Sequence, residues 1–232
     1  MMTKLDQQLA ALYQSIDERG RQQLNAQQIT GDPILAIHEP DQRRGLTLLV
    51  TLPAHVKRNI QFCLTSLRSA APNMYYYPST DLHITILDLL RAQKDFQLSP
   101  AQFSQYQRVI SQVIAQARPV QWTIKNVYLS PVGVLVGGFY SPVLTTIRDQ
   151  IRRQCQQQGL PVMERYRTVS GHMTVARFIK QPTNPQKLLK AVDQLAQLKF
   201  GTFTSYQFSL VVHDWYNQRI DQAAPLPIGQ GA

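Results

Sequence analysis

The sequence predicts a mixed chain of helices and strands built from two related halves. Stretches with apolar residues at helical spacing alternate along the chain with short apolar runs that are typical of strands. A strand, a proline, a helix and a second strand also occur twice in that order, 89 residues apart. In each copy the second strand carries His-x-Thr, first as His83 and Thr85 and then as His172 and Thr174. We therefore expect two halves packed about an approximate twofold axis, each contributing one such strand to a shared cleft.

The composition sets the first limits on function. With 232 residues, 44% of them hydrophobic, the chain can bury the core of one large domain or two small ones. This composition excludes disordered, collagen-like and coiled-coil proteins. Twenty-four Lys and Arg against 14 Asp and Glu give a net charge of +10, which favours an anionic partner. RNA, DNA, nucleotides and acidic lipid all meet that description.

Cysteine use and the start of the chain point to the cytosol. Cys63 and Cys155 are far apart and each lies in a helical pattern, so we expect small buried apolar residues rather than a disulfide or a metal site. The first residues lack the apolar stretch of a signal peptide, and the most apolar run, 132–140, is too short to cross a bilayer. We expect a soluble cytoplasmic protein with no membrane partner.

The first half of the chain opens with a helical extension, residues 1–30, to which we assign no function. Pro53 and Pro100 each suit the first turn of a helix, and Ser99 suits the cap of the second. The elements expected after the extension are a strand at 46–52, a helix at 53–70, strands at 75–77 and 82–90, and a helix from Pro100. The buried side of the 53–70 helix is expected to comprise Val56, Ile60, Phe62, Leu64 and Leu67.

The second half repeats this order and ends in a tail. Ser141 is expected to cap a helix that starts at Pro142 and ends before Gly159, and Asn184 to cap another that starts at Pro185. The expected strands lie at 120–129, 132–140 and 171–179, with one or two more within 200–216. The predicted organisation is a helical extension (1–30), a two-lobed domain (31–220) and a loose C-terminal tail (221–232).

The repeated motif predicts acid–base chemistry. In a strand, residues i and i+2 share a face, so His83 and Thr85 point one way and His172 and Thr174 do the same. Two imidazoles across a cleft can work near pH 7 as base and acid without a metal or other cofactor. The threonine hydroxyls would donate hydrogen bonds to a phosphoryl group as its charge grows. A ribose 2',3'-cyclic phosphate suits this arrangement, because its strained ring already places the leaving oxygen in line.

The paired motifs resemble those of the 2H phosphoesterase superfamily, which includes bacterial 2'-5' RNA ligase-like proteins and cyclic nucleotide phosphodiesterases. The resemblance covers residues 46–216 and rests on LHITIL around His83 and GHMTVARF around His172. It implies a bilobal α+β fold, with two pseudo-symmetric lobes of antiparallel sheets flanked by helices around a central cleft. It also implies metal-independent cleavage or formation of 2',3'-cyclic or 2'-5' phosphodiester linkages. A proline often precedes the second histidine in such proteins, whereas Gly171 does here.

Several residues near the motifs are candidates for substrate binding. Tyr75 and Tyr77 share a strand face and could stack a base, or could simply belong to a half-buried aromatic strand. Arg165 and Arg167 precede the second motif strand and could contact phosphates or lie in a solvated loop. Arg177 lies in the tail of the second motif and completes this set.

Other polar residues are given plainer roles. Arg148, Arg152 and Arg153 are interpreted as the solvated face of a helix, and His38, His55 and His213 as surface or structural residues. Asp81, two residues before His83, could orient that imidazole, form half of a metal site or be a turn residue, and Ser170 is its counterpart before His172.

We expect a monomeric phosphodiesterase that hydrolyses a 2',3'-cyclic phosphate or a 2'-5' diester of RNA ends or nucleotides by two-histidine acid–base catalysis. Two alternatives stay open, namely 2'-5' joining of RNA ends by the same four residues, and a non-catalytic module that binds RNA ends or nucleotides.

Overall fold

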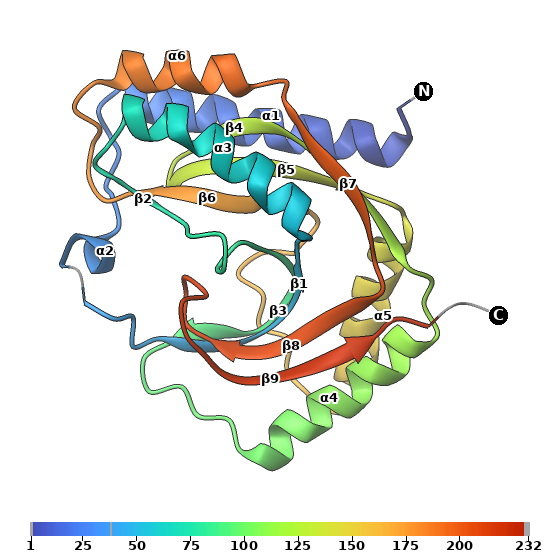
Figure 1. Ribbon diagram of the computed structural model, residues 1–232. Coiled ribbons are helices and arrows are strands. Elements are labelled where there is room, and N and C mark those ends of the chain that lie inside the picture. The colour runs from blue at the N-terminus through green and yellow to red at the C-terminus, as the bar shows by residue number, and fades with distance from the viewer. Residues whose placement is uncertain (1, 38, 230–232) are drawn as a thin grey trace.

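Two antiparallel sheets face each other in the computed structural model, which describes residues 2–37 and 39–229 (Figure 1). The strands are β1 (Arg44–Thr51), β2 (Met74–Tyr76), β3 (His83–Gln93), β4 (Val120–Ser130), β5 (Gly133–Tyr140), β6 (Met173–Phe178), β7 (Lys199–Ser205), β8 (Gln207–His213) and β9 (Ile220–Pro227). One sheet has the order β3-β1-β8-β9 and the other the order β2-β6-β5-β4-β7. The expected α+β architecture with antiparallel sheets is confirmed, and each sheet contains one motif strand.

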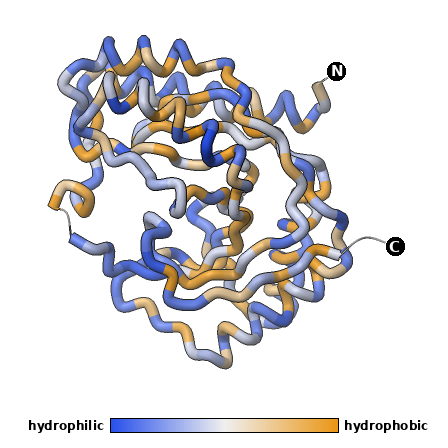
Figure 2. Tube along the Cα trace, in the orientation of Figure 1, coloured by the Kyte–Doolittle hydropathy of each residue, from blue (hydrophilic) through white to orange (hydrophobic). Residues whose placement is uncertain are grey.

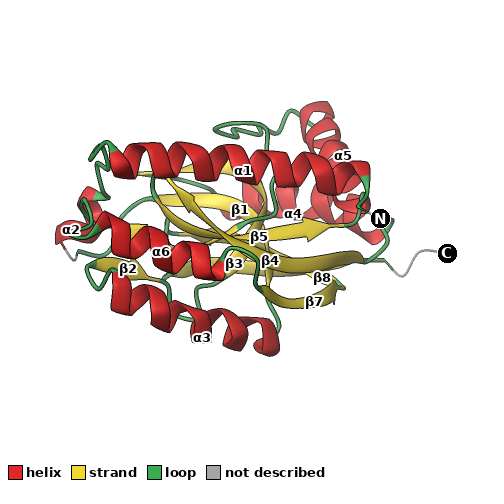
Figure 3. Cartoon of the chain, turned by 90° about the horizontal axis from the view of Figure 1, so that it is seen from above, coloured by secondary structure: helices red, strands yellow, loops and turns green. Residues whose placement is uncertain are grey.

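Helices cover the outer sides of the two sheets. They are α1 (Lys4–Asn25), α2 (Pro33–Ile37), α3 (Ala54–Ala70), α4 (Pro100–Ala115), α5 (Val143–Gln157) and α6 (Pro185–Leu195). Figure 3 shows α1, α6 and α3 lying side by side over the five-stranded sheet, while α4 and α5 pack together beside the four-stranded sheet. The helix that follows β1 therefore lies on the other lobe, and so does the helix that follows β5, which ties the two lobes together.

Local sequence signals explain most helix boundaries. Ser99 caps α4 through a capping box with Gln102, and Asn184 caps α6 by accepting from the backbone of Lys187. Figure 2 shows hydrophobic residues concentrated on the strands, with hydrophilic residues recurring along the helices. Phe62 was expected on the buried side of α3, but it is 82% exposed, because it falls between the buried rows at spacings of three and four residues.

Each motif strand contains a β-bulge at the matching place. The pairing of β3 with β1 skips Ile86, and the pairing of β6 with β5 skips Val175. Each skipped residue directly follows the motif threonine, so the 89-residue repeat extends to the bulges. A bulge shifts the alternation of side chains by one residue. Arg177 is consequently half-exposed, while Ala176 and Phe178 on either side of it are fully buried.

The structure corrects three smaller expectations. The tail expected to be loose from residue 221 forms most of β9, which pairs with β8 along its whole length, while residues 230–232 lie outside the described part. Its prolines fit because β9 is an edge strand, where a missing N–H is tolerated. Ser141 does not cap α5, since its hydroxyl accepts from the Gln121 N–H. Cys63 is half-buried, although Cys155 is buried as expected and both are free thiols.

None of the helices in residues 2–37 and 39–229 is long and apolar enough to span a membrane.

Candidate active site

The two motifs lie at the starts of β3 and β6, which approach each other across the two lobes. His83, Thr85, His172 and Thr174 are all half-buried, whereas the intervening Ile84 and Met173 are buried in the core. The expected alternation of faces is therefore present in both motifs. Within the described ranges, neither threonine hydroxyl hydrogen-bonds to another protein group. The hydroxyls are thus available to a ligand.

The two imidazoles share one electrostatic environment. Burial lowers the pKa of His172 to about 4, with further lowering by the charges of Arg177, Arg148 and His83. Burial also lowers the pKa of His83, with Arg177 again contributing, while the Asp81 carbonyl opposes the shift. One arginine therefore acts on both rings. Both imidazoles are neutral at pH 7 in the free protein, and an anion between them would raise both pKa values.

Each imidazole is held through Nδ1 by the residue two positions earlier. His83 Nδ1 lies 2.8 Å from the Asp81 carbonyl oxygen, which can only accept, so this nitrogen carries the hydrogen. His172 Nδ1 lies 2.8 Å from Ser170 Oγ. The Nε2 atoms make no hydrogen bond with the described residues, so in His83 this atom is the unprotonated acceptor of the neutral ring.

Asp81 orients His83 through its backbone rather than through its carboxylate. Its side chain accepts from the Thr80 hydroxyl at 2.7 Å, and its N–H bonds to the Pro78 carbonyl in a turn. The turn interpretation is confirmed, and the carboxylate does not contact the imidazole. No group of three or more His, Cys, Asp or Glu in the described part of the chain is arranged to hold a metal ion.

His213 is a third histidine beside the pair, and it is buried rather than at the surface. Its ring meets the His83 ring edge-on, with centroids 5.8 Å apart. His213 Nδ1 donates to Asn217 Oδ1 at 2.8 Å, and Asn217 Nδ2 donates to the same Asp81 carbonyl that holds His83. A polar network from β8 and the following turn thus supports the first motif. His55 is exposed, and His38 lies outside the described residues.

Arg148 corrects the solvated-face interpretation of α5. It is 1% exposed, and its guanidinium donates to the carbonyls of Ile86 (2.7 Å), Thr85 (3.3 Å), Ser170 (2.7 Å) and Val169 (3.2 Å). A single side chain therefore joins the first motif strand to the segment that precedes His172. The sequence held a signal for this, since position 148 lies four residues after Leu144 and within the apolar stripe.

The neighbouring arginines of α5 differ from each other. Arg152 is half-buried, pairs with Glu164 at 2.7 Å and donates to the Thr168 carbonyl, so it holds the loop before the second motif. Arg153 is exposed, as expected.

Helix α1 reaches the site through Tyr13, which the sequence did not single out. This side chain is fully buried, and its hydroxyl donates to the Gly138 carbonyl at 2.8 Å while accepting from the Gly171 N–H at 2.9 Å. Gly171 directly precedes His172. A Cβ at position 171 would lie 2.8 Å from the Gly138 carbonyl oxygen and 2.9 Å from Trp122 and Tyr140 ring atoms, so glycine is required for this close packing.

The predicted binding residues separate into two groups. Arg177 lies beside both histidines, and its Nε donates to the Tyr77 hydroxyl at 2.7 Å. Tyr77 is 2% exposed, so the expectation that it stacks a base is wrong and it supports Arg177 instead, while Tyr75 is half-exposed. Arg165 and Arg167 are exposed, and Arg167 pairs with Asp149 at 2.6 Å rather than with the motif residues.

Two facing lobes that each present one His-x-Thr strand define a phosphoesterase of the two-histidine class. The family model described as the 2'-5' RNA ligase superfamily matches residues 53–215. The chain belongs to this superfamily of 2H phosphoesterases. No curated protein matches the sequence.

Solved structures show the same fold at low sequence identity. The Thermus thermophilus protein TT0787 has a TM-score of 0.59 and 15% identity, over 82% of this chain and 98% of that one. Escherichia coli LigT in complex with 3'-AMP has a TM-score of 0.52 and 15% identity, over 81% of this chain and 99% of that one. LigT has also been solved in complex with NADP+, with a TM-score of 0.52 and 13% identity.

Proposed function

We propose that this protein hydrolyses a 2',3'-cyclic phosphate on an RNA end or a nucleotide, with His83 and His172 as acid and base and no metal. The observation that carries the proposal is the shared environment of the two imidazoles. Each ring is anchored through Nδ1, and the charges of His83 and Arg177 both lower the pKa of His172. An anionic phosphoryl group between the rings would relieve this repulsion.

The two histidines are suited to different roles. His172, with a pKa of about 4, is neutral at pH 7 and takes a proton from the attacking water as the oxygen–phosphorus bond forms. His83 is the better general acid, because the Asp81 carbonyl favours its charged form. Its proton goes to the ribose oxygen as the bond from that oxygen to phosphorus breaks. The product is a phosphate monoester beside a free ribose hydroxyl.

The remaining groups stabilise the phosphoryl charge. Thr85 and Thr174 donate from opposite strands to the non-bridging oxygens, and Arg177 supplies a positive charge that Tyr77 holds in place. We assign these four residues and both histidines to the substrate site. The cytosolic location and the monomeric state stay predictions.

Two other functions use the same residues. Run in reverse, the reaction would join RNA ends through a 2'-5' linkage, and the family description favours this second candidate. A module that only binds RNA ends is the third, and LigT structures solved with 3'-AMP and NADP+ show that members of this fold accept nucleotides.

The test is a panel of the four 2',3'-cyclic mononucleotides, with and without EDTA, and products separated by chromatography. We expect turnover to a 2'- or 3'-monophosphate that EDTA leaves unchanged. Binding of the cyclic nucleotides without turnover would identify a binding module. Turnover that EDTA abolishes would contradict the metal-free mechanism.

A further inference from the structure

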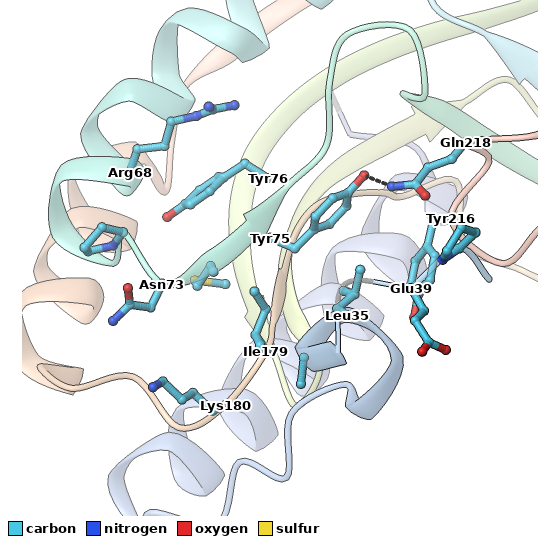
Figure 4. Close-up of a pocket in the computed structure, with 14 residues that line it drawn as sticks. Leu35, Glu39, Arg68, Asn73, Tyr75, Tyr76, Ile179, Lys180, Tyr216 and Gln218 are labelled. Carbon is cyan, nitrogen blue, oxygen red and sulfur yellow. Dashed lines mark hydrogen bonds between the residues drawn. The ribbon is translucent and has the colours of Figure 1, made fainter.

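A groove of about 990 Å³ lies beside the β2 edge of the five-stranded sheet, next to the candidate active site (Figure 4). Its floor and walls include the half-exposed rings of Tyr75 and Tyr76. Arg68 and Lys180 lie on one side and Glu39 on the other. The volume is at the upper end of the range of about 300–1,000 Å³ that is usual for ligand pockets.

The groove and the candidate active site share an aromatic wall. Tyr216 lines the groove, and its ring centroid lies 5.8 Å from the guanidinium carbon of Arg177. Tyr75 also lines the groove and packs edge-on against Tyr77, with centroids 5.0 Å apart. Tyr77 in turn accepts the hydrogen bond from Arg177. A chain whose end is held at Arg177 can therefore continue across these rings into the groove.

The chemistry of the lining matches a nucleotide. Arg68 and Lys180 are exposed and form no ion pair with the residues that the structure describes, so both are available to a phosphate. The Arg68 guanidinium lies 4.9 Å above the Tyr76 ring, and the Tyr75 hydroxyl accepts from Gln218 at 2.7 Å, so both rings are held in place. Aromatic rings beside cations are the usual platform for single-stranded nucleic acid. Glu39 can accept from the amino group of a base.

The N-terminal segment builds one wall of the groove. Leu35 and Ala36 of α2 and the following Glu39 and Pro40 line it, and all four precede residue 53, where the family match begins. The segment is fastened to the second motif strand, because the Asp32 N–H donates to the Phe178 carbonyl at 2.9 Å. The groove is therefore assembled from the superfamily core and a segment outside the match.

We propose that this groove binds the nucleotide that precedes the cyclic-phosphate end, so that the preferred substrate is an RNA chain rather than a cyclic mononucleotide. The proposal rests on the proposed function for the reaction itself. The phosphate that links the last two nucleotides contacts Arg68 and Lys180, and the base of the preceding nucleotide packs on Tyr75 and Tyr76.

The test compares a 2',3'-cyclic mononucleotide with a dinucleotide that ends in the same cyclic nucleotide. We expect kcat/KM to be at least about tenfold higher for the dinucleotide, which is modest for one stacked base and one phosphate contact. The double variant Arg68→Gln/Lys180→Gln should remove most of this preference and leave the mononucleotide value within about twofold. Ala36→Trp, which fills the groove from an exposed position without a change of charge, should do the same.

Matched controls carry the same substitutions on the other lobe. Lys94→Gln/Arg108→Gln and Ala101→Trp change exposed residues that do not line the groove, and both should keep the dinucleotide preference. Equal kcat/KM for the two substrates in the wild-type protein, or an equal loss in groove and control variants, would overturn the proposal.

A binding experiment separates failure of the groove from failure of the proposed function. The probe is a fluorescein-labelled RNA trinucleotide ending in a 3'-phosphate, followed by anisotropy at two salt concentrations. Even if no cyclic phosphate is turned over, the wild-type protein should bind the probe more tightly than Arg68→Gln/Lys180→Gln does. Loss of the two cations should also reduce the salt dependence by about 0.7 per lost phosphate contact. Equal binding and equal salt slopes would refute the groove as an RNA subsite.

Discussion

At the scale of single residues, Arg148 has the largest structural role of the groups that the sequence interpretation assigned to the surface. A buried guanidinium is stabilised only when its donors are satisfied, and the carbonyls of both motif segments supply the acceptors. It also helps to lower the pKa of His172. Arg148 thus positions both histidines without contacting the substrate.

We predict that Arg148→Met lowers both stability and activity. The apolar side chain fills similar space but leaves buried carbonyls unpaired, so the free energy of unfolding should fall by about 3 kcal/mol or more. The control is Arg153→Met, which removes an exposed arginine from the same helix. Urea unfolding checks the stability difference, and kcat/KM measured well below the transition checks the activity. Equal midpoints for the two variants would contradict this role.

Arg177 shows where sequence alternation fails. Strict alternation from His172 and Thr174 places position 177 on the opposite face, yet the bulge at Val175 returns it to the side of the histidines. Resemblance to the family identified the residue, whereas periodicity alone does not. The four His and Thr positions were predictable because i and i+2 in a strand share a face, and that rule holds up to each bulge.

At the scale of elements, α1 connects the N-terminal segment to the second motif. Gly171 stands where a proline is common in related proteins, and unlike proline it has an N–H to donate to Tyr13. The hydroxyl of Tyr13 in turn donates to Gly138 in the neighbouring strand. The helix that was given no function therefore holds the residue before His172.

We predict that Tyr13→Phe reduces kcat as well as stability. The substitution leaves the Gly171 N–H and the Gly138 carbonyl buried and unpaired, which costs about 1–3 kcal/mol. Since Gly171 adjoins the base, kcat should fall more than KM changes. Tyr206→Phe is the matched control, because that ring is exposed. A Tyr13→Phe protein with wild-type kcat and wild-type unfolding would show that α1 does not support the motif.

The element order was largely predictable, and β9 shows the limit. Alternating apolar residues, proline-initiated helices and caps identified the strands and helices up to residue 213, because each signal is local. Strand β9 has the sequence IDQAAPLP, with little apolar content and two prolines. It forms because the exposed edge of β8 offers backbone partners, and that edge exists only in the folded protein.

At the scale of the whole molecule, three neutral histidines lie between the lobes. The folded pKa is about 4 for His172 and about 3 for His213, against 6.5 in the unfolded chain, and that of His83 is also lowered. Between pH 6.5 and the folded pKa values, the unfolded chain binds more protons than the folded one. Stability is therefore unaffected above pH 6.5 and falls as the pH drops below it, by about 1.4 kcal/mol per unit for each such histidine.

We predict that His213→Asn makes the protein less sensitive to acid. The asparagine amide can still donate to Asn217, but it does not titrate. Between pH 7.5 and 5.0, the variant should lose about 2 kcal/mol less unfolding free energy than the wild-type protein. Urea unfolding at the two pH values checks this. An identical loss in both proteins would show that His213 titrates normally.

The two lobes are related down to their bulges, and this symmetry underlies the central claim. Each lobe supplies one imidazole and one hydroxyl, and helices exchanged between lobes fix the two strands relative to each other. Such an arrangement is suited to a reaction in which one ring gives a proton while the other takes one. Removing either ring should then cost nearly as much as removing both.

The most direct measurement is hydrolysis of a 2',3'-cyclic nucleotide in EDTA by His83→Ala, His172→Ala, the double variant and the exposed control His55→Ala. The account predicts a loss of about 10²–10⁴ in kcat for each single variant, little further loss in the double variant, and an unchanged rate for the control. Near-normal turnover by either His83→Ala or His172→Ala would contradict acid–base catalysis by this pair.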